Sequence, residues 1–455
     1  MIRNQQIHKV AQGLLVAALL IPTAYAEDLF TVYQHAKESD PQISAAESGY
    51  LSTLEKRPQA LANFKPKVTL TTTASYRVSK SSNFAGNDES AVASAGYQLQ
   101  LSKPLYRQQI NEQIAQTDIV IAQAEESLLA EQQNLILRVT EAYFNYLTAR
   151  DGAEFARSES SAVERQYKQV KAYFEAGRSA ITDVKESQAR YDESVANVVI
   201  TDQNVDIALE SLHALTGRYY KVLRGATRQT PLVVPSPNDI KAWSTAASQN
   251  NKQVKVADYA VKVAQKSVDI ARAAKKPTLD LFANHNGNIT QGENQSDMES
   301  GDATIGIQFN LSLYDAGKMD SSIREARYSF HKAMHQLEAQ KRAAVQQART
   351  YYLNIVTGLS QVKALKRSLE SSQIANKATQ EGFRVGTRTA VDVLLALRDS
   401  YRAQKNYSSA RYAFLLNTIR LKQAAGTLSE SDLQALSRIL SHSRSTRQPP
   451  VKPAK

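Results

Sequence analysis

The sequence predicts a mainly α-helical protein with a small β part, built from two copies of one unit. Three observations predict this: a motif that recurs 209 positions later, long stretches without proline, and short regions in which apolar and polar residues alternate. The motif runs Phe174-Glu-Ala-Gly177-Arg-Ser-Ala-Ile-Thr-Asp183-Val184 and returns as Phe383-Arg-Val-Gly386-Thr-Arg-Thr-Ala-Val-Asp392-Val393. Internal repetition at a long period limits the folds to repeat architectures.

Two proline-free regions of 126 and 171 residues follow Pro104 and Pro277 and indicate long helices, because proline costs about 3 kcal/mol in a helix interior. Apolar residues sit seven apart in both, which is the period of coiled-coil packing. They are Ile114, Ile121, Leu128, Leu135 and Ala142, and, 209 positions later, Ile323, Phe330, Leu337, Ala344 and Tyr351. We expect a helix over about 107–175 that ends at Gly177. Second helices over about 182–215 and 389–424 would begin near Thr182 and Thr389.

Before each hairpin the apolar period changes to two. Apolar residues alternate with Thr and Ser over 68–78, a polar loop is expected over 81–94, and alternation resumes at 97–101. The second copy has a strand near 278–288, an expected loop over 291–302 and alternation over 304–313. Strands of about ten residues with one apolar face are typical of membrane barrels. Four strands cannot close a barrel, so they pair with strands of other subunits, or the sheet is soluble.

The first residues are typical of a cleaved export signal. Arg3 and Lys9 flank the start of an apolar stretch over 11–21, and Ala24 and Ala26 match a cleavage site. The stretch is too short to span about 30 Å of hydrocarbon. The expected organisation is a signal peptide (1–26), a first repeat (27–235), a second repeat (236–440) and a basic, disordered tail (441–455).

Composition argues against several functions. The formal charge is +12, but no concentrated basic stripe outside the tail suggests nucleic acid as a partner. The chain has no cysteine, and it has no phosphate-binding Gly-Lys-Ser/Thr loop or nucleophile elbow. His331 and His335 have metal-ligand spacing, but they lack the glutamate of an HExxH motif. We therefore expect no enzyme activity, metal site or cofactor.

At this point the chain resembles the TolC family of outer-membrane efflux and secretion channels, from residue 27 to about 440. The resemblance is carried by the doubled strand-loop-strand unit, the long hairpins and three motifs. These are Ser-Lys-Pro104-Leu-Tyr106, Leu-Ser-Leu-Tyr314-Asp-Ala-Gly317 and Val385-Gly-Thr-Arg388-Thr-Ala-Val-Asp392-Val-Leu.

The resemblance implies a homotrimer in the outer membrane. Three sets of four strands would form one twelve-stranded β-barrel in contact with outer-membrane lipid, and the helices would form a hollow α-barrel across the periplasm. The channel would export small molecules, proteins or both, as the exit duct of tripartite efflux pumps or type I secretion systems. A periplasmic adaptor (membrane fusion) protein and an inner-membrane transporter of the RND or ABC class would dock at the periplasmic end and open it.

The resemblance also implies a pore constriction at the hairpin ends. Asp392 matches the first of two acids that form a ring in the family, and Leu395 stands where the second acid is found. We expect a weaker cation block and a more apolar constriction. From the residues alone, Asp392 is more typical of a solvated acid or of an acid at a helix N-terminus, which the helix dipole favours; the resemblance is what points to the pore.

Polar links between helices hold the family's channels closed. Thr182, Asp183 and Arg388 match one such set, and an Asp183–Arg388 pair between subunits is the expected contact. Phe383 stands where the family has a tyrosine, and Gln380 stands where it has a glutamate that faces Gln166. The remaining expected site, which docks the adaptor, lies at the hairpin tips and comprises Gly177, Arg178 and Gly386.

A soluble periplasmic coiled-coil adaptor is the alternative interpretation. Adaptors also contain long hairpins, but they would show one hairpin flanked by all-β domains instead of two hairpins that each follow a pair of strands. The sequence does not identify the cargo. In the channel interpretation, the loops over 81–94 and 291–302 face the outside of the cell.

Overall fold

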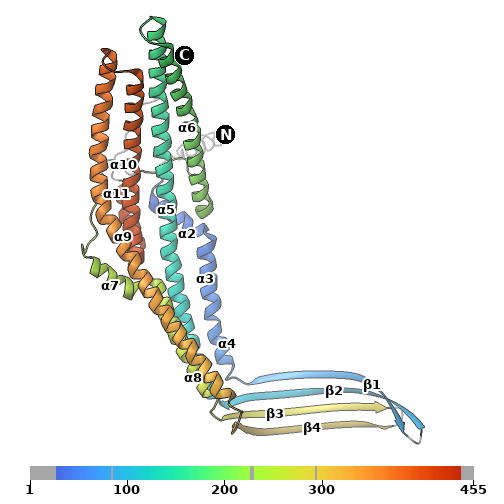
Figure 1. Cartoon of the computed structure of the whole chain (residues 1–455). Helices are drawn as coiled ribbons and strands as arrows, with labels where there is room; N and C mark the ends of the chain where they lie inside the picture. Colours follow the sequence, from blue (N-terminus) through green and yellow to red (C-terminus); the bar gives the residue numbers. More distant parts are fainter. Residues whose placement is uncertain (1–26, 84–85, 226–229, 293–294, 442–455) are drawn as a thin grey trace, which may run out of the picture.

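The chain, described by a computed structural model over residues 27–83, 86–225, 230–292 and 295–441, is an elongated body of helices with one sheet at its end (Figure 1). The predicted signal peptide, and the predicted tail from residue 442 onward, lie outside these residues. The first elements are α2 (Leu29–Ser39), α3 (Pro41–Leu54), α4 (Lys56–Ala62), β1 (Lys67–Asn83), β2 (Gly86–Tyr106), α5 (Gln108–Glu175) and α6 (Ile181–Thr216). The order then repeats with α7 (Ile240–Asn250), α8 (Lys252–Ala273), β3 (Thr278–Gly292), β4 (Gln295–Asn310), α9 (Lys318–Arg384) and α10 (Ala390–Ala424), and α11 (Glu430–Ser441) follows.

The predicted helices are confirmed. Helix α5 has 68 residues and α9 has 67, and each pairs with a shorter helix, α6 or α10, to form a hairpin. All ten residues of the seven-residue series are buried or half-buried, because a stripe of this period stays on one face of a supercoiled helix. Both hairpin tips lie at the end of the molecule opposite the sheet (Figure 1).

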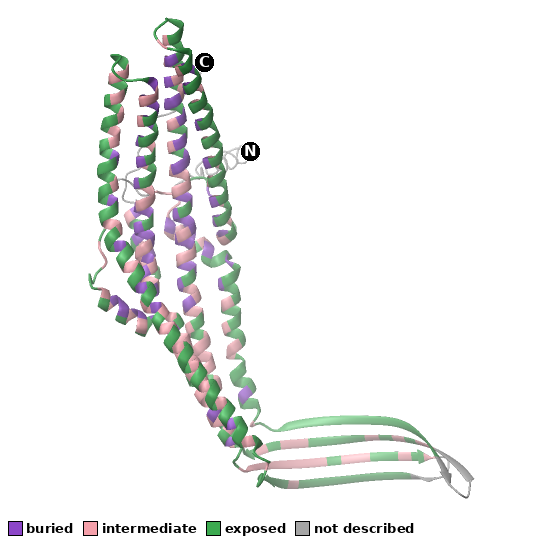
Figure 2. Cartoon of the chain, in the orientation of Figure 1, coloured by how far each residue is buried: buried purple, intermediate pink, exposed green. Residues whose placement is uncertain are grey.

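The four strands form one antiparallel sheet in the order β1-β2-β3-β4. Register keeps the apolar residues on one face: Leu70 lies opposite Leu99, and Leu281 lies opposite Ile307. Most residues of the sheet are exposed or half-buried, whereas buried residues concentrate on the helices (Figure 2). The single chain therefore leaves both faces of the sheet and both of its edges uncovered.

The predicted strand lengths and the two predicted loops are wrong. The strands have 17, 21, 15 and 16 residues, and the pairing extends through most of 81–94 and 291–302, for example from Ser81 to Asp88. Ladder hydrogen bonds join backbone groups, so a hairpin continues where side chains are polar on both faces. Alternation disappears there because neither face is apolar, and the sequence pattern then looks like a loop.

The main core lies at mid-length, where both hairpins meet the short helices. Tyr143, Phe144 and Leu147 of α5 pack with α2, α7, α10 and α11. Asp151 of α5 accepts hydrogen bonds from Tyr412 Oη (2.9 Å) and Ser408 Oγ (2.6 Å) of α10. These contacts join the two hairpins at a level between their tips and the sheet. Within the described residues, no helix is both long and apolar enough to cross a membrane.

Candidate functional site: the ends of the helical hairpins

The two hairpins end in the same turn. Gly177 has φ +71° and Gly386 has φ +81°, a left-handed conformation that side chains other than glycine adopt at a cost. The amides that follow each helix donate to carbonyls of its last turn, as in a Schellman motif. The bonds are Gly177 N to Phe174 O (2.9 Å), Arg178 N to Tyr173 O (2.7 Å), Gly386 N to Phe383 O (3.1 Å) and Thr387 N to Gly382 O (2.8 Å). The sequence-predicted tips are therefore tight, hydrogen-bonded turns.

An aspartate begins the second helix of each hairpin. Asp392 Oδ2 accepts from Thr389 N at 2.9 Å, and Thr389 Oγ1 accepts from Asp392 N at 3.1 Å, which is a reciprocal capping box. The Thr389 backbone and hydroxyl hold the pKa of Asp392 below its ordinary value. Asp392 thus acts as a helix N-terminal acid within its own chain, and its pore-facing role concerns three chains and stays a prediction.

The equivalent aspartate in the first hairpin has different partners. Asp183 Oδ2 accepts from Ser179 Oγ at 2.8 Å and from Ala180 N at 3.3 Å. Thr182, which we expected to help start the helix, lies exposed in its first turn. Both helices begin where predicted, and Thr389 is the N-cap residue of α10. The N-cap position of α6 is occupied by Ala180, so the expected contribution of Thr182 to starting that helix is wrong.

Arg388 lies in the turn between α9 and α10, and its side chain lies beside the last turn of α9. A Cβ at Gly382 would lie 2.8 Å from Arg388 Cγ, so the arginine stem occupies the space that a side chain at 382 would fill. Within the described residues, Arg388 forms no ion pair with Asp183 of the same chain. The expected Asp183–Arg388 contact joins two subunits and stays a prediction.

The two glutamines are not brought together in one chain. Gln166 is 7 % exposed on α5, and its Nε2 has no hydrogen-bond partner among the described residues. Gln380 Nε2 donates to Asn376 Oδ1 of its own helix at 3.2 Å. A buried amide without a hydrogen bond is costly, so the Gln166 side chain remains available to a partner outside the single chain.

Phe383 joins the two hairpins through apolar contacts. From α9 it packs against Val170 and Val184 of the first hairpin, and its ring lies 5.7 Å from that of Tyr173. It also packs in a cluster with Ala162 and with Val393 and Leu397 of α10. Sequence reasoning considered only the hydroxyl that phenylalanine lacks and missed this packing role, which becomes visible only when both hairpins are placed side by side.

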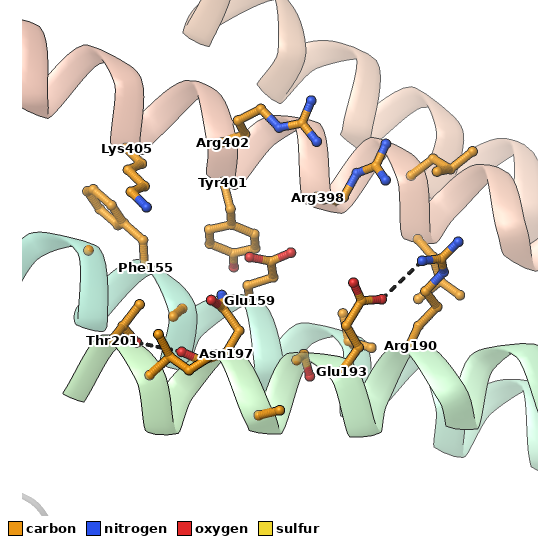
Figure 3. A pocket seen from close by; sticks show the side chains of 18 residues that line it. Phe155, Glu159, Arg190, Glu193, Asn197, Thr201, Arg398, Tyr401, Arg402 and Lys405 are labelled. Atoms are coloured by element: carbon orange, nitrogen blue, oxygen red, sulfur yellow. Dashed lines mark hydrogen bonds and ion pairs between the residues drawn. The ribbon is translucent and has the colours of Figure 1, made fainter. Parts of the chain in front are cut away.

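A hollow of about 500 Å³ lies between α5, α6 and α10 (Figure 3). Leu395 contributes to its wall, and charged side chains from all three helices surround it. The labelled charged residues are Glu159, Arg190, Glu193, Arg398, Arg402 and Lys405, with Arg190 bound to Glu193 at 3.0 Å. Burial raises the pKa of Glu159. No sequence signal pointed to this group, because its members come from three separate segments.

A sequence model of the family described as outer membrane efflux protein matches residues 32–218 and 243–427. These two segments make up well over half of the chain. The chain belongs to this family. Its members are channels of the outer membrane, and this one is an outer-membrane exit duct for efflux or type I secretion.

Curated relatives agree with the family. The outer membrane protein TolC of Vibrio cholerae is 34 % identical over 417 residues, which are 91 % of this chain and 94 % of that protein. TolC of Escherichia coli is 32 % identical, covering 94 % and 88 % of the two chains. The alkaline protease secretion protein AprF of Pseudomonas aeruginosa is 26 % identical, covering 91 % and 88 %. The predicted resemblance is confirmed, and no match supports the alternative of a soluble adaptor.

Two solved structures have the same fold. A structure of CusC superposes with a TM-score of 0.73 at 18 % identity, covering 88 % of this chain and 92 % of that one. The outer membrane protein VceC of Vibrio cholerae gives a TM-score of 0.68 at 14 % identity, with 88 % and 96 % covered. The family is not enzymatic. His331 and His335 lie exposed on α9, and the described residues contain no group of three or more potential metal ligands.

Proposed function

We propose that three copies of this chain form one channel whose periplasmic end is closed by the hairpins and opened by partner proteins. The observation that carries the proposal is that a single chain leaves both edge strands of its sheet without a neighbouring strand. Strands β1 and β4 are the edges of the sheet, each with at least 16 residues of unpaired backbone on its outer side. Long exposed edges invite pairing with another chain, and three chains would supply twelve strands, enough to close a barrel.

The two outer helices of the hairpin layer, α6 and α9, both expose apolar side chains. Helix α6 exposes Val199 (65 %) and Ile207 (56 %), and α9 exposes Leu353 (51 %) and Ile374 (69 %). Apolar residues spread along a helix side are covered by packing against another helix. When α6 of one subunit lies against α9 of the next, the start of α6 with Asp183 comes beside the end of α9 with Arg388.

Closure in this proposal depends on polar and apolar contacts of different strength. An exposed Asp183–Arg388 pair contributes about 0–1 kcal/mol. Phe383 is half-buried between the hairpins, and full burial of such a side chain is worth about 1.5–3 kcal/mol. Opening that separates the hairpins exposes Phe383, so the apolar contact contributes at least as much to closure as the ion pair.

The constriction would be formed by Asp392 and Leu395 near the threefold axis, and Gln166 and Gln380 would meet between helices. A ring of three Asp392 carboxylates focuses a negative potential that attracts cations. The tips with Gly177, Arg178 and Gly386 would receive the periplasmic adaptor, which links the channel to an inner-membrane transporter of the RND or ABC class. The channel has no catalytic role and uses no cofactor in this proposal.

The subunit contact is tested by cysteine cross-linking, for which a chain without cysteine is suited. Asp183→Cys combined with Arg388→Cys should give covalent dimers and trimers on non-reducing gels after mild oxidation. The matched control combines Asp183→Cys with Lys363→Cys, which is exposed further along α9. Monomers alone, with both thiols open to a small reagent, would contradict the proposed contact.

The role of the pair in closure is tested in planar bilayers. Arg388→Ser should raise single-channel conductance, because it removes the ion pair and leaves the turn intact. Arg178→Ser is the matched control in the first hairpin, whose guanidinium lies 4.9 Å from the Tyr173 ring of its own chain. Equal conductance for Arg388→Ser and the parent would count against a closing role for the pair.

A further inference from the structure

Basic residues collect where the sheet joins the helices. The connecting segments 63–67, 103–108, 272–280 and 311–320 contain eight basic and three acidic residues, a difference of +5. We call the basic members the junction belt: Lys65, Lys67, Lys103, Arg107, Arg272, Lys275, Lys276 and Lys318. The far end of the sheet is the reverse, with two basic and six acidic residues over 77–90 and 291–302. Net positive charge is therefore found only at the helical end of the sheet, and the far end has a net negative charge.

The three acidic side chains of these segments already have partners within the chain. Asp280 binds Arg107 through two bonds of 2.9 and 2.7 Å, and Asp320 binds Lys275 at 2.5 Å. Asp315 accepts from the amides of Gly317 (3.1 Å) and Met319 (2.6 Å).

The belt's free lysines therefore carry uncompensated charge. Five lysines of the belt are exposed and form no ion pair within the part of the chain that the structure describes. They are Lys65, Lys67, Lys103, Lys276 and Lys318. Lys67 lies opposite Ser102 on the polar face of the sheet, so the proposal below uses the other four. A trimer would carry three such sets around one circumference.

The register of β2 places one of these ammonium groups at the border of the apolar face. Lys103 follows Leu99 and Leu101 on that face and lies opposite Leu281 of β3. The next exposed aromatic residues towards the helices are Tyr106 and Phe309, and Tyr314 is 88 % exposed beyond them. Aromatic residues and lysine stems with this order are typical of the level where acyl chains meet headgroups.

We propose that the junction belt binds the phosphates of anionic phospholipids in the leaflet of the outer membrane that faces the periplasm. The inference rests on the proposed channel, in which the helices are periplasmic. Lysine clusters beside a membrane-spanning segment attract anionic headgroups, and the apolar face next to Lys103 would contact their acyl chains. The acidic far end of the sheet repels the same headgroups, so the preference is restricted to one side of the membrane.

The proposal is tested with the full-length chain in detergent by native mass spectrometry, which counts lipids retained on the protein. The probe lipids are phosphatidylglycerol and phosphatidylcholine with the same acyl chains. The parent should retain phosphatidylglycerol at least about tenfold more strongly, given roughly fivefold for each lysine near an anionic surface. The combined variant Lys65→Gln, Lys103→Gln and Lys276→Gln should lose this preference, and Lys→Arg at the same positions should restore it.

The matched control removes three exposed lysines elsewhere that form no ion pair with any residue the structure describes: Lys241→Gln, Lys363→Gln and Lys377→Gln. It should retain the lipid preference of the parent. An unchanged preference in the belt variant, an equal loss in the control, or displacement of the lipid by millimolar inorganic phosphate would each overturn the proposal. Conductance in planar bilayers is measured alongside and should stay at the parental value, so failure of the channel itself would be recognised separately. If the triple variant fails to fold, Lys103→Gln alone should reduce retention severalfold.

Discussion

Gly177 and Gly386, which follow the long helices, allow a prediction of how much free energy a substitution to alanine costs. Gly177→Ala and Gly386→Ala place a methyl group where nothing lies within 4 Å, so the change is purely one of backbone conformation. An L-residue in the left-handed region costs about 1–2 kcal/mol. The alanine also restricts the unfolded chain, which offsets part of this cost by about 0.4–1 kcal/mol.

Gly426 is the matched contrast. It has φ +71°, as at the tips, but a Cβ there would overlap the Asn250 carbonyl and the amide of Asn251. These atoms belong to the junction of α7 and α8, where Asn251 Nδ2 also donates to Ala424 O at 3.0 Å. Gly426→Ala therefore adds a steric conflict with backbone to the same conformational cost. We expect the largest destabilisation of the three, on the order of 4 kcal/mol.

Amide hydrogen exchange and thermal unfolding separate the two effects. Each tip variant should speed exchange in its own turn by about 4-fold and by at most about 15-fold, because the net cost is about 0.8 kcal/mol, at most about 1.6 kcal/mol, and 1.4 kcal/mol corresponds to a factor of ten. The melting temperature of the detergent-solubilised channel should stay almost unchanged, since hairpin tips open locally before the core. Gly426→Ala should lower the melting temperature markedly. A Gly426→Ala channel as stable as the parent, or tips whose exchange is unchanged, would refute the reasoning.

Three further predictions concern single side chains. Asp392→Asn and Asp392→Ala should both lower cation selectivity in bilayers, but only Asp392→Ala should speed exchange at the start of α10, because asparagine keeps an oxygen for the Thr389 amide and a lost cap costs about 1 kcal/mol. Tyr412→Phe should lower the free energy of unfolding by about 1–2 kcal/mol in denaturant titration, since it deletes a buried bond to Asp151, and an unchanged midpoint would contradict this. Burial raises the pKa of Glu159, so the folded state binds this proton more tightly and loses stability as pH rises from the unfolded pKa towards the folded one. Glu159→Gln should therefore melt higher than the parent at pH 8, with the gain shrinking towards pH 4.5, the ordinary value of the group.

The helices were predictable because the residues that specify them follow one another within a single segment of the sequence. The seven-residue series and the absence of proline placed α5, α6 and α10 to within two residues, and glycine marked both turns. The strands were predicted too short, since alternation reports an apolar face and is silent where the ladder continues through polar residues such as Ser81 and Ser90.

The site was less predictable because its contacts join segments far apart in the chain. The resemblance predicted Asp183, Arg388 and Asp392 as site residues. Within one chain, however, the two aspartates bind local groups at the starts of their helices, and the stem of Arg388 lies beside Gly382. The packing of Phe383 and the charged group around Glu159 depend on how the two hairpins lie against each other. Neither a period nor a motif in one segment carries that information.

The two copies of the turn have the same backbone hydrogen bonds but different side chains. The side-chain differences at two positions depend on each other. Position 179 of the first copy corresponds to 388 of the second, and position 173 corresponds to 382. In the first copy Ser179 binds Asp183 of its own chain, and Tyr173 lies under the guanidinium of Arg178.

In the second copy the tyrosine is replaced by Gly382 and the serine by Arg388, whose stem occupies the space that the missing side chain leaves. Arg388 lies against the helix end only because residue 382 has no Cβ. Gly382→Ala should therefore displace Arg388 and raise single-channel conductance by the same mechanism as that expected for Arg388→Ser, although residue 382 itself bears no charge. The glycine and the arginine act as one unit, and a closing contact based on Arg388 requires both.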